Sequence, residues 1–190
     1  MNKLTLETFN NLPIRDHIGS VLNDHNMLGS VAEVGVLFGS FARMVLTEWK
    51  GERYYAVDPW ERQSGEVYKE RTEHMDYELA YRQVREMAKQ DTRICMLRGM
   101  SVTMARFIPD NSLDLCFIDG NHAYGPVLED MDAWWPKVRP GGIFSGHDYG
   151  DDTNPPHWCE VKSAVDRWMY EHDVDFALDK HGSSWWSIKA

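Results

Sequence analysis

The sequence lacks any long apolar run and any excess of basic charge. No stretch approaches the roughly 20 apolar residues of a membrane-spanning helix, and the first residues do not show the basic-then-apolar order of a signal peptide. The 190 residues contain 30 Asp and Glu against 20 Lys and Arg, giving a net charge of −10 at pH 7. That balance argues against broad contact with a nucleic-acid backbone. We therefore expect a cytoplasmic protein with no membrane and no nucleic-acid partner.

Cysteine is also scarce. Only Cys95, Cys116 and Cys159 occur, two of them inside apolar runs, and no C-x-x-C spacing is present. An odd number of cysteines without such spacing favours buried thiols in a reducing compartment over a disulfide framework.

The motifs of several large enzyme classes are missing. Neither H-E-x-x-H nor G-x-S-x-G occurs, so a zinc protease and a serine hydrolase lack their motif. The N-P-P-H segment at residues 154–157 is similar to a motif of amino methyltransferases. It follows the fifth predicted strand instead of the fourth, which disfavours methylation of DNA.

The residues that are present predict alternating strands and helices. Apolar periodicity predicts one or two helices within residues 4–28 and a C-terminal pair of short strands at 174–178 and 185–188. Between them we expect strands at 31–36, 53–57, 92–97, 113–118 and 143–145, and helices at 40–49, 74–90, 101–107, 125–135 and 161–169. The order predicts one α/β domain over residues 1–190. Its sheet would be Rossmann-like, seven-stranded and mostly parallel, with helices on both faces and a C-terminal antiparallel hairpin.

Acidic residues mark the ends of three predicted strands. Asp58 ends the second strand, Asp119 follows the fourth and Asp148 follows the fifth. Because ligands of such sheets bind at the carboxyl ends of the strands, these acids are expected to share one site.

The turn after the first strand contains E-x-G-x-x-x-G, from Glu33 to Gly39, where a dinucleotide fingerprint has G-x-G-x-x-G. Like charges about 5 Å apart repel by roughly 3 kcal/mol at an effective dielectric near 20, so Glu33 is expected to disfavour a pyrophosphate. The same acid would attract an ammonium or a sulfonium, and S-adenosylmethionine carries both. Asp58 lies at the spacing expected for a ribose ligand.

Five segments in order resemble a known family: EVGVLFGSFA, YYAVDPW, the RGMS turn, LDLCFIDGNHAY and RPGGIFSGHDYG. Over residues 31–150 the chain resembles class I S-adenosylmethionine-dependent methyltransferases. Within them it is most similar to the branch with FIDGxHxY and PGG…HDY, the small-molecule O-methyltransferases of the macrolide-sugar and cephamycin type. The resemblance implies S-adenosylmethionine as cofactor and a small-molecule acceptor, methylated at a hydroxyl.

The resemblance also implies a set of cofactor contacts. Glu33, Gly35 and Gly39 would shape the pocket for the methionine part, and Asp58 would bind the ribose. Residues 100–101 and Trp60 would flank the adenine. The full expected set is Glu33, Gly35, Val36, Gly39, Ser40, Phe41, Asp58, Trp60, Gly99, Met100, Ser101, Asp119, Gly120 and His122.

The expected catalytic residues are Asp119, His122, His147 and Asp148. Either histidine could act as the base that removes the acceptor proton. A divalent cation such as Mg²⁺ offers another route, and by resemblance its ligands would be Asp119, His147 and Asp148. His147 stands where the family has an acid, which weakens an oxygen-lined Mg²⁺ site and leaves room for a softer ion or none.

Residues 1–30 and 60–90 are expected to form the acceptor side, the latter as a lid. Tyr55, Tyr68, Tyr77 and Tyr81 are candidate lining residues there. The sequence leaves open whether the protein forms a homo-oligomer. Two alternatives are kept: an NAD-type oxidoreductase, disfavoured by the turn sequence, and a methyltransferase-like binding module that has lost turnover.

Overall fold

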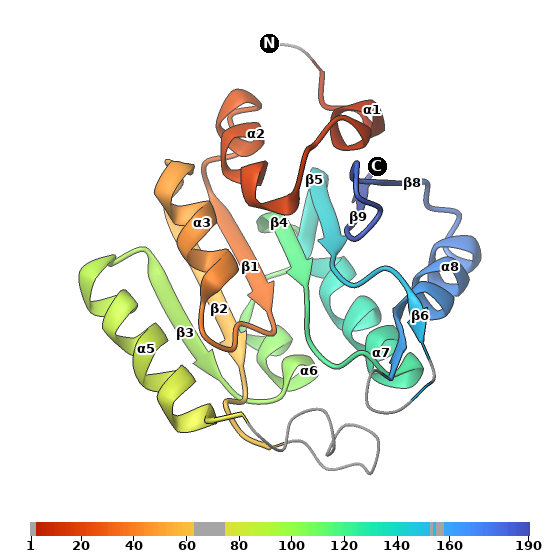
Figure 1. The fold of residues 1–190 in the computed structure, drawn as a ribbon. Coiled ribbons are helices and arrows are strands. Elements are labelled where there is room, and N and C mark those ends of the chain that lie inside the picture. Colours follow the sequence, from red (N-terminus) through yellow and green to blue (C-terminus); the bar gives the residue numbers. More distant parts are fainter. Residues whose placement is uncertain (1–2, 63–74, 153, 155–157) are drawn as a thin grey trace.

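The computed structural model describes residues 3–62, 75–152, 154 and 158–190. A seven-stranded sheet forms its middle layer, in the order β3-β2-β1-β4-β5-β9-β8 (Figure 1). The first five strands pair in parallel, and the last two add to the edge as an antiparallel hairpin. The bounds are β1 Ser30–Val34, β2 Arg53–Asp58, β3 Ile94–Arg98, β4 Leu113–Ile118, β5 Val138–Gly146, β8 Phe176–Leu178 and β9 Trp185–Ile188. The predicted fold class is confirmed.

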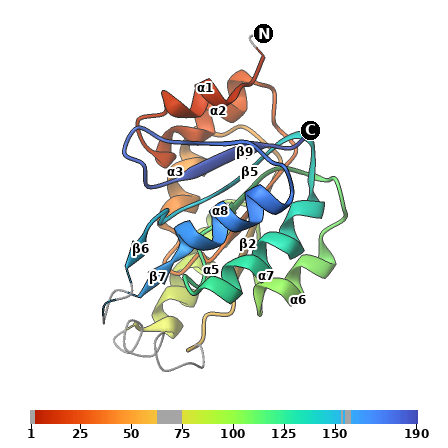
Figure 2. The ribbon, with the colours of Figure 1, turned by 90° about the vertical axis from the view of Figure 1, so that its right-hand side faces the viewer.

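Helices cover both faces of the sheet. One face carries α1 (Leu6–Asn10), η1 (Arg15–His17), α2 (Ile18–Asp24), α3 (Ser40–Glu48) and α5 (Tyr77–Gln90). The other carries α6 (Ser101–Met104), η2 (Ala105–Phe107), α7 (Tyr124–Trp134), η3 (Trp135–Lys137) and α8 (Val161–Glu171). Figure 2 shows α6, α7 and α8 side by side in this second layer.

Strand β4 shows how the sheet divides two hydrophobic cores. All six of its residues are buried. Leu115 and Phe117 belong to the core under α1, α2, α3 and α5. Cys116 and Ile118 belong to the core under α7 and α8. A central parallel strand is buried on both faces, which explains why every residue of β4 except Asp114 is apolar.

Strand β5 is longer than predicted. Leu113 pairs with Val138 and Leu115 with Ile143, so the register shifts and part of the RPGG segment bulges out. A Cβ on Gly142 would lie 2.8 Å from a Val138 methyl and 2.9 Å from the Leu113 carbonyl oxygen. The predicted strand at 143–145 therefore extends back to Val138 through a bulge.

A second, two-stranded ladder was not predicted. It joins β6 (Asp151–Asp152) to β7 (Cys159–Glu160) in antiparallel pairing. The Glu160 N–H also donates to the His122 carbonyl oxygen at 2.8 Å. This ladder therefore ties the segment after β5 to the segment after β4.

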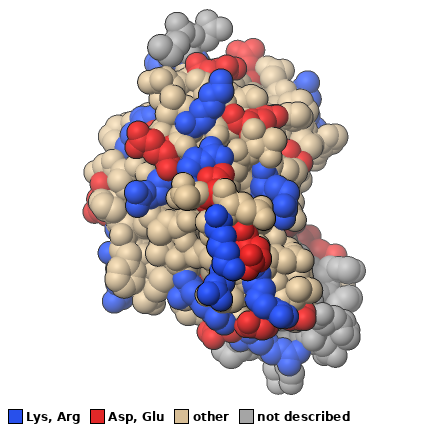
Figure 3. Space-filling view, turned by 90° about the vertical axis from the view of Figure 1, so that its left-hand side faces the viewer, with Lys and Arg blue, Asp and Glu red and all other residues tan. Residues whose placement is uncertain are grey.

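The surface around α5 and β3 carries mixed charge. Basic and acidic side chains are interspersed on this side of the molecule (Figure 3), and Lys89 pairs with Glu86 on α5. Cys116 is buried, as predicted, whereas Cys95 and Cys159 are only partly buried. Within the described ranges, no helix has the length and apolar character needed to cross a membrane.

Candidate functional site

A cavity of about 630 Å³ opens at the carboxyl ends of β1, β2 and β4. Strands β1 and β4 are neighbours although β2 and β3 separate them in sequence, so this is the point at which the strand order reverses. Open α/β sheets bind ligands at such a point, and the volume is typical of a small-molecule site.

Gly35 lets two chain segments approach closely at the base of the cavity. Its φ is +90°, and a Cβ built on it would lie 2.1 Å from the Asp119 carbonyl oxygen. The backbone N–H of Asp119 donates to the Val34 carbonyl oxygen at 2.7 Å. A side chain at position 35 would push apart the ends of β1 and β4.

Asp58 fixes the turn between β1 and α3. Its Oδ2 accepts the backbone N–H groups of Val36 and Leu37, both at 2.9 Å, and its Oδ1 accepts that of Trp60 at 2.6 Å. Burial raises the pKa of Asp58, while these three hydrogen bonds act in the opposite direction. The carboxylate lines the cavity and also organises the main chain around it.

Glu33 differs from the sequence prediction. We expected a fixed negative charge at the turn, but the side chain is 2% exposed and its Oε2 accepts the Tyr54 hydroxyl at 2.7 Å. Burial raises the pKa of Glu33 well above its ordinary value, which favours the neutral acid. The electrostatic argument against a pyrophosphate therefore shifts to Asp58 and Asp119, which line the same cavity.

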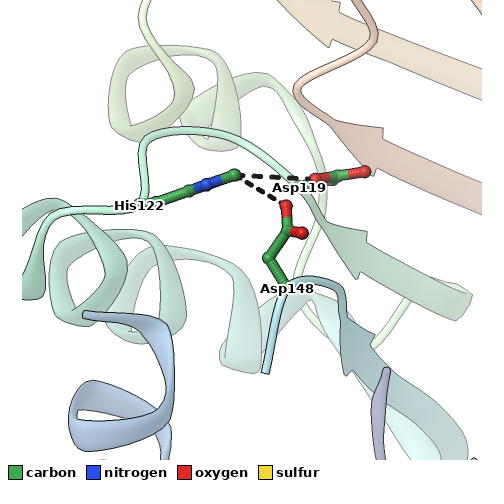
Figure 4. Close-up of side chains that lie close together, drawn as sticks. All are labelled: Asp119, His122 and Asp148. Atoms are coloured by element: carbon green, nitrogen blue, oxygen red, sulfur yellow. Dashed lines mark ion pairs between the residues drawn. The ribbon is translucent and has the colours of Figure 1, made fainter. Parts of the chain in front are cut away.

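Asp119, His122 and Asp148 come together at the ends of β4 and β5 (Figure 4). The His122 Nε2 lies 3.1 Å from Asp148 Oδ2 and 3.7 Å from Asp119 Oδ1. One ligand atom from each residue falls within 4.8 Å of the others. Two carboxylates and one imidazole at this spacing are a donor set that divalent cations accept.

His147 is not part of this cluster, although we predicted it among the metal ligands. Asp148 has a φ of +51°, so the chain turns sharply between the two residues. The His147 Nδ1 lies 3.3 Å from Asp148 Oδ1, and His147 is not among the described residues that line the cavity. The structure brings His122 to the position that we assigned to His147.

Eleven of the fourteen predicted cofactor residues line the cavity: Glu33, Gly35, Val36, Ser40, Phe41, Asp58, Met100, Ser101, Asp119, Gly120 and His122. Trp60 does not, because its side chain is 1% exposed and its indole N–H donates to the Leu37 carbonyl oxygen. Trp60 therefore stabilises the turn between β1 and α3 and does not line the cavity. Gly39 faces Val84 and Met87 of α5, and Gly99 faces Met104.

Sequence analysis missed several charged residues of the cavity, among them Arg15, Glu129 and Asp130. Arg15 of η1 lies above the rings of Phe41 and Phe117 and donates to Asp119 Oδ2 at 2.6 Å. The pattern in residues 4–28 indicated only an apolar helix face and gave no signal for this pair.

Asp130 of α7 is 6% exposed, and burial raises its pKa to about 7. The Ser101 side chain hydrogen-bonds to it, and the Trp134 indole N–H donates to Ser101 Oγ at 2.8 Å. A signal existed here, because Asp130 lies on the helical face formed by Val127, Met131 and Trp134.

The acceptor-side prediction is tested only in part. Glu61 and Tyr77, from the segment at 60–90, line the cavity together with Arg15. Tyr81 instead packs edge-on against Trp60. The candidate Tyr68, with residues 63–74 of the predicted lid, falls outside the described residues, as do residues 155–157.

Comparison with known proteins identifies the family. A family model described as a methyltransferase domain matches residues 32–149. The uncharacterised protein y4gI of Sinorhizobium fredii is 30% identical over 125 residues, 62% of this chain and 13% of that protein. An uncharacterised protein of Acanthamoeba polyphaga mimivirus is 37% identical over 57 residues, 30% of this chain and 24% of that protein. The chain thus spans less than a quarter of these relatives.

Solved structures share the fold. The O-methyltransferase NovP has a TM-score of 0.68 at 18% identity, covering 93% of this chain and 78% of its own. TomG from Streptomyces achromogenes, an O-methyltransferase in complex with S-adenosylmethionine, has a TM-score of 0.60 at 15% identity, covering 93% and 80%. Since the family model matches more than half of the chain, the protein belongs to the methyltransferase-domain family, and its fold is that of S-adenosylmethionine-dependent methyltransferases.

Proposed function

We propose that this domain transfers a methyl group from S-adenosylmethionine to a hydroxyl group of a small-molecule acceptor. The observation that carries the proposal is the acidic cavity at the point where the strand order reverses, in a chain of the methyltransferase-domain family. NovP and TomG, which share the fold, are O-methyltransferases by name.

The cofactor is expected to lie across the ends of β1, β2 and β4. Asp58 is well placed for the ribose hydroxyls, and Met100 and Ser101 for the adenine. The methionine part would then lie toward Glu33 and Asp119, where the Asp119 carboxylate would favour its ammonium and sulfonium charges.

In this methyl transfer the main task of the protein is to align S-adenosylmethionine and the acceptor. The acceptor oxygen forms a bond to the methyl carbon, the carbon–sulfur bond breaks, and its electron pair stays on sulfur. The acceptor hydroxyl must also lose a proton, and His122 Nε2 faces the cavity beside Asp148. Asp148 Oδ2 lies 3.1 Å from this nitrogen and would hold the ring in place.

A divalent cation fits the same residues. Asp119, His122 and Asp148 would hold it, and their mixed oxygen and nitrogen donors suit Mn²⁺, Fe²⁺ or Zn²⁺ as well as Mg²⁺. Such an ion, when bound, would lower the pKa of a hydroxyl that coordinates it. Arg15 now occupies one oxygen of Asp119, so it competes for that ligand.

The test is a methyl-transfer assay with isotopically labelled S-adenosylmethionine and a panel of hydroxylated acceptors, run with EDTA and then with Mg²⁺ or Mn²⁺. Labelled methyl groups should appear in an ether product, and the Asp148→Asn variant should lose most of the rate. Cofactor binding without turnover on any acceptor would favour the inactive binding module. Binding of NADH in its place would favour the oxidoreductase.

A further inference from the structure

The described lining of the cavity contains seven acidic residues and one Arg or Lys. The acids are Glu33, Asp58, Glu61, Asp119, Glu129, Asp130 and Asp148, and the cation is Arg15. A cavity that served only an ammonium and a sulfonium would need no cation. An isolated guanidinium among acids is therefore a feature that the proposed function does not yet explain.

Arg15 is held in place with most of its donors unused. A guanidinium has five N–H donors in a planar fork, and the described part of the chain shows one hydrogen bond for it, from Nη1 to Asp119 Oδ2. Its carbon Cζ lies 5.5 Å from the Phe41 ring centroid and 5.6 Å from that of Phe117. The two rings and Asp119 fix the group, whose side chain is 23% exposed.

The position of Arg15 is at the Glu33 and Asp119 end of the cavity. Its charge acts on Glu33, where it opposes the rise in pKa that burial causes. An α-amino acid carries one carboxylate and one ammonium on the same carbon. Arg15 and Asp119 present the complementary pair of charges, and without a ligand they neutralise each other.

We propose that Arg15 binds the carboxylate of the methionine part of S-adenosylmethionine and makes the site select the intact amino acid over its decarboxylated form. Arginine suits this role because its fork matches a carboxylate in two parallel hydrogen bonds. The inference rests on the proposed function. Arg15 lies outside the residues matched by the family model, so it is a contribution of the N-terminal segment of this chain.

The test compares two ligands by calorimetry. S-adenosylhomocysteine carries the carboxylate and the ammonium, whereas S-adenosyl-3-thiopropylamine keeps the ammonium and lacks the carboxylate. The wild type should bind the first at least tenfold more tightly. Arg15→Gln should weaken S-adenosylhomocysteine by about 10- to 100-fold, the loss expected for a charge-assisted pair. It should change the thiopropylamine little, and Arg15→Lys should recover part of the loss.

A matched control is Arg139→Gln. Arg139 pairs with Asp114 at 2.6 Å, as Arg15 does with Asp119, but neither Arg139 nor Asp114 lines the cavity. It should bind both ligands as the wild type does, and thermal unfolding of each variant verifies that it is folded. Equal losses for both ligands in Arg15→Gln, or equal affinities in the wild type, would overturn the inference and leave the proposed function standing. A wild type that binds neither ligand would overturn both.

Discussion

The turn between β1 and α3 and the cluster at the ends of β4 and β5 hold their acids in different ways. In the turn, both oxygens of Asp58 accept backbone N–H groups. In the cluster, the Asp119 and Asp148 carboxylates contact other side chains, those of Arg15, His122 and His147. Asp58 is thus bonded to the main chain, whereas Asp119 and Asp148 contact side chains that can rotate away.

This difference separates structural from replaceable contacts. A buried backbone N–H that loses its acceptor is left without a hydrogen bond, which costs free energy. Asp58 should therefore contribute to folding as well as to binding. Each side chain of the cluster can give up its present partner and bind a ligand, a proton or a cation in its place. Substitutions in the turn should therefore lower the stability of the fold, whereas substitutions in the cluster should lower the rate of turnover.

The largest expected effect is at the turn itself. Gly35→Ala places a Cβ against the Asp119 carbonyl at a φ of +90°, so it should cost several kcal/mol or prevent folding. Urea unfolding measures the loss. Gly125→Ala is the matched control, because nothing lies within 4 Å of its Cβ, and it should be neutral or stabilising. A Gly35→Ala protein as stable as the wild type would remove the close approach from the account.

Asp58→Ala should be the next most damaging change. Three backbone N–H groups would lose their acceptor, and an unsatisfied buried donor costs about 1–3 kcal/mol. We expect a loss of about 2–4 kcal/mol in the free energy of unfolding, with weaker binding of S-adenosylhomocysteine. Unaltered stability with weaker binding would mean that Asp58 serves the ligand alone, and the contrast between the regions would disappear.

The cluster should show the reverse behaviour. Asp148→Asn should change the free energy of unfolding by less than about 1 kcal/mol, yet reduce kcat by about 10²-fold or more, as expected when a positioned base loses its partner. His147→Gln is the companion variant, since His147 does not line the cavity, and its rate should fall much less. A larger loss in His147→Gln than in His122→Gln would return the role of base to His147.

A smaller effect concerns the pH dependence of stability, because buried acids lie near both regions. The pKa of Asp130 is about 7 in the folded protein against an ordinary 3.8. As the pH rises from about 4 to about 7, the unfolded chain releases this proton and the folded one retains it, so stability falls. Urea titrations should show a steeper fall for the wild type than for Asp130→Asn, by up to a few kcal/mol. Parallel profiles would mean that Asp130 ionises normally.

The order of elements could be predicted from the sequence because each has a local cause. The apolar run Leu115–Ile118 of β4 indicates a buried strand, and the helical spacing of apolar residues on α7 indicates an amphipathic helix. The bulge in β5 could not be predicted, because the register between β4 and β5, which shifts between Leu113 and Leu115, is set by tertiary packing. The β6–β7 ladder, of two residues per strand, is too short to show a period.

The site could be predicted only in part. Acids at the strand ends are visible in the sequence, but the partner of each acid is not. Glu33 meets Tyr54 because the register pairs Glu33 with Ala56, which places Tyr54 two residues along on the same face. Arg15 meets Asp119 across 104 residues. His122, and not His147, joins Asp119 and Asp148 in the cluster, which depends on how the loops after β4 and β5 meet.

The central claim is that the cavity between β1 and β4 receives an adenosyl amino acid and not a dinucleotide. Titration calorimetry of the wild-type protein with S-adenosylhomocysteine and, separately, with NADH tests this most directly. We predict saturable one-to-one binding of S-adenosylhomocysteine and no measurable heat with NADH. Binding of NADH without any response to S-adenosylhomocysteine would contradict the account.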